Sequence, residues 1–182
     1  MMFKLSDKLR LATVKRWHMV RTLREQSVAE HAALVQIIGL QILGDFSSGV
    51  YDELNKGMLM EWALYHDMPE VILGDIPTPF KQILEEKSPG LIENIEMEMF
   101  PEYAMIKEDT PELIKIIVKF ADLFEAIKFI SIEGHGEHAD SVRKSLINNI
   151  KAMTLNVSKD ESPSMKFLSD IFNLYIGCNF HG

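Results

Sequence analysis

The sequence lacks the features that mark several classes of protein. It has one cysteine, Cys178, so no disulfide can form within the chain and a zinc site built from several cysteines is excluded. No stretch approaches the ~18 uninterrupted apolar residues that a membrane-spanning helix needs. Residues 1–4 lack the apolar segment of a signal peptide. We therefore expect a soluble, cytoplasmic protein with no membrane partner.

Positive charge is also scarce. The chain has 19 Lys and Arg against 27 Asp and Glu, a formal net charge of −8, whereas proteins that bind nucleic acid polymers are normally basic. The basic residues are unevenly spread, because six of them and no acidic residue lie between Lys8 and Arg24. The average charge thus argues against a nucleic acid polymer but leaves room for a small phosphorylated partner near this segment.

Alternating strand patterns and internal repeats are absent, and helical spacing of apolar residues dominates. With 182 residues, 47% of them hydrophobic, we predict an all-α fold, a compact helical bundle that forms a single domain over residues 1–182. Ser27 and Glu30 form a capping box that opens one helix, and residues 74–79 are expected to be a loop. A first helix is expected over about 5–14, and a second from 28 to the helix-breaking residues at 44–49. A third covers about 52–67 and is followed by a short turn after Pro69. The remaining helices are expected over about 80–87, a segment ending near 99, 111–132, 139–155 and 163–176.

Four ionisable residues fall where these helices should be apolar. His31 shares a helix face with Val28, Leu34, Val35 and Ile38. The other three, found among apolar neighbours in the same way, are His66, Asp67 and Asp122. A buried, unpaired carboxylate costs several kcal/mol, so such groups need a common partner. A divalent cation fits, because imidazole nitrogen and carboxylate oxygen both bind Zn, Mn, Co or Fe well.

Simpler interpretations exist for each residue taken alone. A single histidine such as His31 is more often a hydrogen-bonded core residue than a ligand, and Asp122 could form an ion pair with Lys119 or Lys115. Glu70, one turn beyond the His66-Asp67 pair, could simply be an exposed acid on a short helix. The segment 135–138 contains two histidines, but its glycines indicate an exposed loop.

The order of the motifs resembles that of a known family. His31, His66-Asp67 and Asp122 are similar to the H…HD…D signature of HD-domain metal-dependent phosphohydrolases. The resemblance is closer to the YfbR-like 5′-deoxynucleotidase branch, and short phage HD-domain dATP triphosphohydrolases are related. The matching segments are Arg16-Trp17, Glu30-His31, residues 66–70, residues 74–81 and residues 119–122. They span a motif-bearing core of about 8–132, and the C-terminal helices at about 139–176 would serve packing or assembly.

The resemblance implies a role for each matching residue. His31, His66, Asp67 and Asp122 would bind one divalent transition metal ion (Co, Mn, Zn or Fe). Asp67 and Glu70 would be catalytic, with Glu70 beside the nucleophilic water. The substrate-binding residues would be Arg16 on the phosphate, Trp17 against the sugar, Asp75 at the 3′-hydroxyl, and Thr78 and Lys81 in the same segment. Without the resemblance, Arg16 is a surface arginine, Trp17 a core residue and Asp75 a turn residue.

The implied activity is removal of the 5′-phosphate from deoxynucleoside monophosphates by a metal-activated water. The alternative is release of triphosphate from a deoxynucleoside triphosphate, which more basic groups near the site would favour; Lys15, Arg21 and Arg24 are available. A non-catalytic nucleotide sensor is a more distant alternative. Such proteins typically lack one metal ligand or the catalytic carboxylate, whereas here the four ligands and Glu70 are all present. The family also implies a homodimer or higher homo-oligomer, and the apolar last helix could be either an interface or ordinary core.

Overall fold

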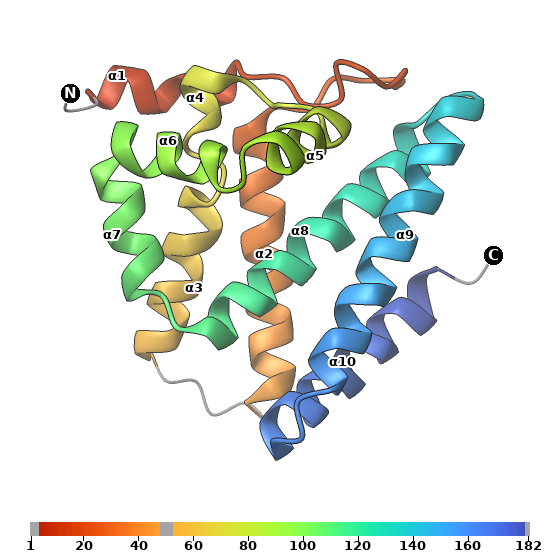
Figure 1. Cartoon of the computed structure of the whole chain (residues 1–182). Helices are drawn as coiled ribbons and strands as arrows, with labels where there is room; N and C mark the ends of the chain where they lie inside the picture. Colours follow the sequence, from red (N-terminus) through yellow and green to blue (C-terminus); the bar gives the residue numbers. More distant parts are fainter. Residues whose placement is uncertain (1–3, 48–52, 181–182) are drawn as a thin grey trace.

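The computed structural model describes residues 4–47 and 53–180, and within these ranges the chain is helical without a sheet (Figure 1). Two isolated bridges, Lys15 with Ser27 and Thr22 with Gly134, are the only strand-like pairings among these residues. The prediction of an all-α fold is therefore confirmed. The helices are α1 (Leu5–Lys8), the 3₁₀ turn η1 (Leu9–Ala12), α2 (Val28–Phe46), α3 (Glu53–Tyr65), α4 (Glu70–Leu73), α5 (Thr78–Lys87), α6 (Leu91–Met99), α7 (Pro101–Asp109), α8 (Glu112–Glu133), α9 (Glu137–Ser158) and α10 (Pro163–Asn179).

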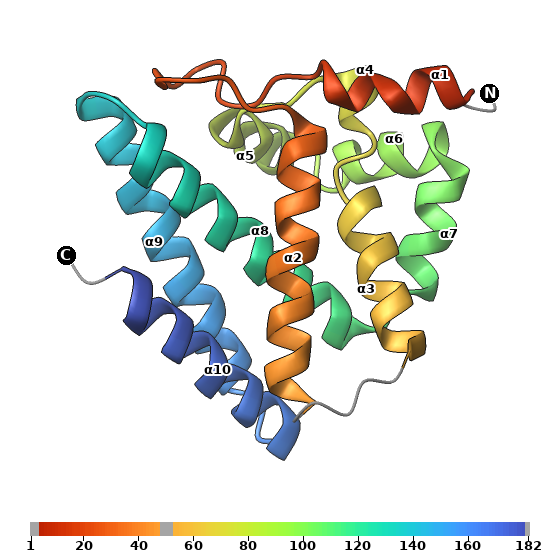
Figure 2. The same cartoon turned by 180° about the vertical axis from the view of Figure 1, so that it is seen from behind.

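Helices α2 and α8 form the centre of the molecule and cross each other (Figure 1). Helix α3 packs against both of them, and α9 packs on α8 and α10. Seen from behind, α3 and α7 lie on one side of α2, and α9 and α10 lie on the other (Figure 2). The N-terminal helix α1 and the loop that follows η1 run across one end of this arrangement (Figures 1 and 2). The site described below lies where α2, α8 and this loop meet.

Some of the predicted helix boundaries agree with the structure and others do not. Ser27 Oγ accepts a hydrogen bond from the Glu30 N–H at 3.1 Å, so α2 begins with the expected cap. The prediction of a loop over 74–79 was wrong at its end: Thr78 and Pro79 form the first turn of α5, where proline fits because its missing N–H would have no helical partner. Helix α7 was not predicted. The expected breakers Ser48 and Gly49 lie outside the described residues.

The hydrophobic core is built mainly from α2, α3, α8 and α10. Phe120 of α8 stacks on Phe172 of α10 with ring centroids 3.9 Å apart. Phe172 and Leu168 are fully buried, whereas Phe167 and Leu174 of the same helix are exposed. The buried face of the last helix is thus ordinary core. Among residues 4–47 and 53–180, no helix has the length and apolar character that crossing a membrane requires.

Candidate metal centre

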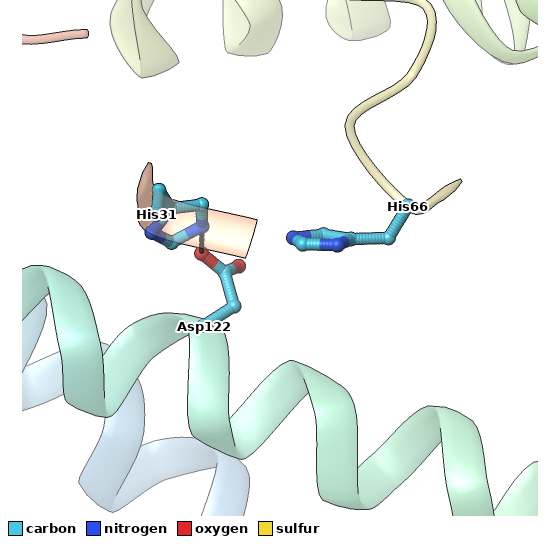
Figure 3. Close-up of side chains that lie close together, drawn as sticks. All are labelled: His31, His66 and Asp122. Atoms are coloured by element: carbon cyan, nitrogen blue, oxygen red, sulfur yellow. Dashed lines mark ion pairs between the residues drawn. The ribbon is translucent and has the colours of Figure 1, made fainter. Parts of the chain in front are cut away.

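Three side chains from separate elements converge on one point (Figure 3). His31 comes from α2, His66 follows the end of α3, and Asp122 comes from α8. One potential ligand atom from each lies within 4.8 Å of the other two. His31 Nε2 is 3.3 Å from Asp122 Oδ1. Residues that are far apart in the sequence are therefore brought to the spacing that a single cation needs.

The two imidazoles are held so that their Nε2 atoms face this point. His66 Nδ1 donates to the Ala63 carbonyl oxygen at 2.7 Å, and His31 Nδ1 is 2.5 Å from Glu125 Oε2. Both Nε2 atoms are buried, and neither has a hydrogen-bond partner within the described part of the chain. Buried nitrogens without partners are costly, whereas two imidazoles fixed through Nδ1 are a common way to present Nε2 to a metal. The residues present thus fit a divalent metal ion.

Two aspartates complete the cluster. Asp67 Oδ2 lies 3.6 Å from His31 Nε2 and 3.4 Å from His66 Nε2. The same oxygen accepts a hydrogen bond from Arg16 at 2.9 Å. Asp122 accepts from Lys119 at 2.8 Å through Oδ2, while its Oδ1 faces His31. The ion pair that offered a simpler explanation for Asp122 therefore exists, but it occupies only one of the two carboxylate oxygens.

The charges of the cluster suit a cation. Burial lowers the pKa of His66, which favours the neutral imidazole that a metal requires. Burial alone would raise the pKa of Asp122, but Lys119 and His31 hold it well below its usual range. Asp67 likewise keeps a lowered pKa despite burial, because His66 and Arg16 stabilise its charge. Burial and Arg16 oppose a charge on His31, but Asp122 and Glu125 outweigh them and raise its pKa. The cluster thus presents two carboxylates beside the neutral imidazole of His66, with His31 held between carboxylates.

Glu70 lies next to this cluster at the start of α4. It is 6% exposed, its Oε2 is buried without a hydrogen-bond partner in the described residues, and its Oε1 is 3.7 Å from Lys81 Nζ. Burial, followed by the negative charges of Asp67 and Asp75, raises the pKa of Glu70 to about 9. Because negative neighbours contribute to this shift, positive charge placed at the cluster would lower the pKa again.

Arg16 and Trp17 lie in the loop between η1 and α2. The Arg16 side chain is 11% exposed and lies between the two aspartates, with a nitrogen 4.0 Å from Asp122 Oδ1 in addition to its bond to Asp67. Trp17 has φ +64°, an uncommon value for a residue other than glycine. Its ring stacks on Phe129 of α8 at 5.9 Å with an interplanar angle of 5°. The sequence-predicted pair is thus beside the cluster, with Arg16 buried in it and Trp17 at its side.

The remaining sequence-predicted residues lie in or after the loop that joins α4 to α5. Asp75 is half-buried and near enough to raise the pKa of Glu70. Lys81 approaches Glu70 as described above. Thr78 is exposed at the start of α5, and no hydrogen bond or ion pair joins it to the cluster in the part of the chain that the structure describes. The structure therefore gathers Asp75 and Lys81 around Glu70 and leaves Thr78 at the edge.

Sequence reasoning missed two buried polar residues beside the site. Glu125 is 3% exposed and contacts His31, and Gln26 is 1% exposed and donates to Glu125 at 2.6 Å. A signal for Glu125 was available, since it follows Asp122 by three positions and therefore shares its helix face. Gln26, in a loop, gave no comparable signal. Residues 135–138 are exposed as expected, but the prediction of a loop was wrong for the second half of the segment, because Glu137 and His138 form the first turn of α9.

Comparisons with known proteins agree with this geometry. A family model described as 5′-deoxynucleotidase YfbR-like matches residues 5–161. A dATP triphosphohydrolase of cyanophage S-2L is 30% identical over 146 residues, which cover 80% of this chain and 79% of that protein. A 5′-deoxynucleotidase of Yersinia pseudotuberculosis is 26% identical over 177 residues, covering 90% and 87% of the two chains.

Solved structures give the same result. The HD phosphohydrolase DatZ of cyanophage S-2L, solved with dA and one catalytic Zn²⁺ ion, superposes with a TM-score of 0.76 at 26% identity and covers 98% of this chain and 99% of its own. An HD-domain phosphohydrolase from Listeria innocua shares the fold, with a TM-score of 0.62 at 21% identity over 94% and 87% of the two chains. The motifs, the cluster and these matches together place the protein: the chain belongs to the 5′-deoxynucleotidase YfbR-like family of HD-domain proteins.

Proposed function

We propose that the protein is a metal-dependent phosphohydrolase that removes the 5′-phosphate from 2′-deoxynucleoside monophosphates. The observation that carries this proposal is the pair of buried Nε2 atoms, on His31 and His66, that face Asp122 without hydrogen-bond partners. The family membership and the metal-bound structure of DatZ support the same chemistry. We assign the metal ligands as His31, His66, Asp67 and Asp122.

The metal, when bound, supplies positive charge to the phosphoryl group and lowers the pKa of water enough to provide a nucleophile near neutral pH. Among Zn, Mn, Co and Fe, we propose Zn as the bound metal, because DatZ was solved with one catalytic Zn²⁺ ion. The protein supplies the rest. Arg16, a planar guanidinium held beside Asp67, neutralises charge on the phosphoryl oxygens. Burial keeps this guanidinium away from competing water.

Glu70 is the residue we assign to proton transfer. Its buried Oε2 has no partner in the described chain, and positive charge at the cluster would lower its raised pKa, so that Glu70 accepts a proton from the nucleophilic water. Lys81, 3.7 Å from the other oxygen, holds the carboxyl group in place and adds positive charge. Asp67 links Arg16 to the histidines and so connects phosphate binding with the metal cluster.

The remaining assignments concern the sugar. Trp17, fixed on Phe129, would pack against the deoxyribose and leave no room for a 2′-hydroxyl. Asp75, in the loop beside Glu70, would accept a hydrogen bond from the 3′-hydroxyl. Thr78 is the weakest substrate-binding assignment, since it is exposed and lies at the edge. These roles follow the family resemblance and the positions of the side chains around the cluster.

The number of phosphates on the substrate separates our proposal from a second candidate. Two of the basic groups that could bind a longer phosphate chain are engaged elsewhere: Lys15 pairs with Glu25 at 2.5 Å, and Arg24 pairs with Glu30 at 2.7 Å and with Glu133 at 3.1 Å. This favours the monophosphate. The triphosphate candidate is favoured by three phage dATP triphosphohydrolases that are 30–31% identical over 70–80% of this chain. Assays of dAMP and dATP in parallel, with phosphate and triphosphate measured separately, decide between them.

The central test is Asp67→Ala. We expect this variant to lose metal, measured by elemental analysis, and to lose turnover with it. Asp160→Ala is the matched control, because Asp160 is an exposed acid that contacts Ser162 far from the cluster, and this variant should keep both properties. Full activity of Asp67→Ala in the presence of a chelator would overturn the assignment. Nucleotide binding without turnover in the wild-type protein would favour a non-catalytic sensor.

Two further proposals concern the state of the protein. We infer a homo-oligomer on the family resemblance, and the exposed Phe167 and Leu174 of α10 offer apolar surface for it. Light scattering of the purified protein gives the mass directly, and a monomeric mass would contradict the proposal. We also infer a cytoplasmic location, where Cys178, free and exposed, would stay reduced.

A further inference from the structure

A buried row of hydrogen bonds runs from the metal cluster to Trp17. His31 Nδ1 is 2.5 Å from Glu125 Oε2, and Glu125 Oε1 accepts from Gln26 Nε2 at 2.6 Å. Gln26 Oε1 in turn accepts from the Trp17 indole N–H at 2.8 Å. Gln26 and Glu125 are 1% and 3% exposed, so solvent cannot replace these partners. One continuous network thus joins a metal-ligand candidate to a substrate-binding candidate.

The Trp17 indole fixes the direction of both bonds that the Gln26 side chain makes. An indole N–H can only donate, so the Gln26 oxygen must face Trp17 and the Gln26 amide nitrogen must face residue 125. Residue 125 therefore has to accept from Gln26 on one oxygen, and an ionised Glu125 accepts from His31 Nδ1–H on the other. A carboxylate can do both, whereas an amide can accept on one side only. With its proton on Nδ1, His31 keeps a lone pair on Nε2, the atom that faces Asp122.

Gln26 also holds the backbone of the substrate-binding pair. The Arg16 N–H donates to the Gln26 carbonyl oxygen at 2.9 Å. Trp17, the next residue, has the unusual φ of +64°, a conformation that persists only where surrounding contacts over-determine it. The stack on Phe129 and the bond to Gln26 are such contacts. Gln26 therefore controls where both Arg16 and Trp17 lie relative to the cluster.

We propose that Glu125 and Gln26 are positioning residues that set the His31 tautomer and the Arg16–Trp17 conformation together, so that metal binding and the substrate-binding loop are coupled. This inference rests on the proposed function of the cluster and deepens it. Neither residue touches the converging atoms, and each acts through another side chain. The network predicts that binding of a metal at His31 changes the environment of the Trp17 indole N–H.

The main test is Glu125→Gln, which keeps the size of the side chain but places a donor where two acceptors are needed. We expect the affinity for Zn²⁺, measured by competition with a chromophoric chelator, to fall about 10–100-fold, as is typical when a group behind a metal-binding histidine is lost. We also expect the Trp17 indole N–H resonance, assigned by its absence in Trp17→Phe, to shift when Zn²⁺ is added to wild type. That shift should be lost in Glu125→Gln.

Gln26→Leu separates the two halves of the network. It leaves the His31–Glu125 contact in place, so Zn²⁺ affinity should fall less than in Glu125→Gln, while the response of the Trp17 resonance to Zn²⁺ disappears. The matched control is Gln36→Leu, which removes a glutamine that donates to the Met60 carbonyl at 2.6 Å, away from the network. It should retain both the affinity and the Trp17 response of wild type.

Both readings are made without substrate, so they are independent of whether wild type hydrolyses deoxynucleotides. Wild-type Zn²⁺ affinity and an unchanged Trp17 response in folded Glu125→Gln would overturn the inference, even if the enzyme is active. If Glu125→Gln does not fold, as judged by circular dichroism, Gln26→Leu decides alone: a Trp17 resonance that still responds to Zn²⁺ overturns the coupling, and loss of the response supports it.

Discussion

Two stripes of helix α8 face different neighbours and differ in what they leave unsatisfied. One stripe presents Asp122, Glu125 and Phe129 to His31 and the Arg16–Trp17 loop. The other presents Phe120 and Phe124 to α10, where Phe120 stacks on Phe172. The ring centroids of Phe124 and Tyr175 are 5.8 Å apart. We call these the polar stripe and the aromatic stripe of α8.

The comparison shows that one face of α8 contributes to the stability of the fold and the other to the binding site. The aromatic stripe packs against other rings of the described residues, and burial of large rings is strongly stabilising. The polar stripe gathers ionisable groups from several elements and leaves two histidine nitrogens without hydrogen-bond partners among the described residues. Such groups cost stability until a ligand satisfies them. Mutations in the two stripes should therefore affect different measurements.

Asp122→Asn should have the largest effect and break the polar stripe alone. Loss of the carboxylate that faces His31 should lower metal affinity at least about 100-fold and remove turnover, since even groups behind the ligands contribute 10–100-fold. The stability of the metal-free protein should fall by less than in a core truncation, because the variant loses the pairs with His31 and Lys119 but keeps the packing of α8 on α10. Metal titration and calorimetry measure the two quantities separately.

Lys119→Met is the control for this prediction. It removes the ion pair with Asp122 but leaves the cluster of Asp122 with His31 and His66 in place. Metal affinity should therefore remain much closer to wild type than in Asp122→Asn. Equal loss in the two variants would mean that Asp122 acts through its ion pair and not as a ligand.

Phe172→Ala should break the aromatic stripe and have the opposite signature. Truncation of a fully buried phenylalanine costs about 3–5 kcal/mol of unfolding free energy. Denaturant titration measures this loss, and metal affinity below the new melting temperature should stay at the wild-type value. Phe167→Ala, on the same helix but 45% exposed, should cost far less. A parallel loss of metal affinity in Phe172→Ala would show that the two stripes are not independent.

Local signals predicted much of this architecture. Ser27 marked the start of α2, and the apolar spacing around His31 and Asp122 placed both residues on inward faces. The contact between Glu125 and His31 could not be predicted in the same way, because it joins residues 94 positions apart and depends on how α2 crosses α8. The φ of Trp17 is likewise held by contacts that local signals do not show, above all the stack on Phe129 of α8, a residue distant in the sequence.

The errors have the same origin. Thr78 and Pro79 contain every local signal of a loop, yet they form a helical turn because proline is compatible with that position. Thr110, just before α8, does not cap that helix, because its hydroxyl donates to the Ile106 carbonyl and completes the end of α7. Each residue satisfies its hydrogen bonds with the partner that the tertiary structure offers, which the sequence signal alone does not specify.

The smallest effect should come from Glu102, which lies outside both stripes. Lys8 and Tyr65 both donate to its carboxylate, Tyr65 at 2.8 Å, and these bonds lower the pKa of Glu102 from its ordinary 4.5. A carboxylate with a lowered pKa in the folded state contributes stability above its unfolded pKa and loses it as the pH falls through the folded value. Because the Glu102 side chain is 56% exposed, solvent screening limits this contribution to about 1 kcal/mol or less. The free energy of unfolding of wild type should therefore exceed that of Glu102→Gln by this small margin at pH 7. The margin should vanish as the pH falls below about 4.5. Urea titrations of the two proteins at several pH values measure it, and a margin that persists unchanged at pH 3 would contradict the assignment of this stability to the Glu102 carboxylate.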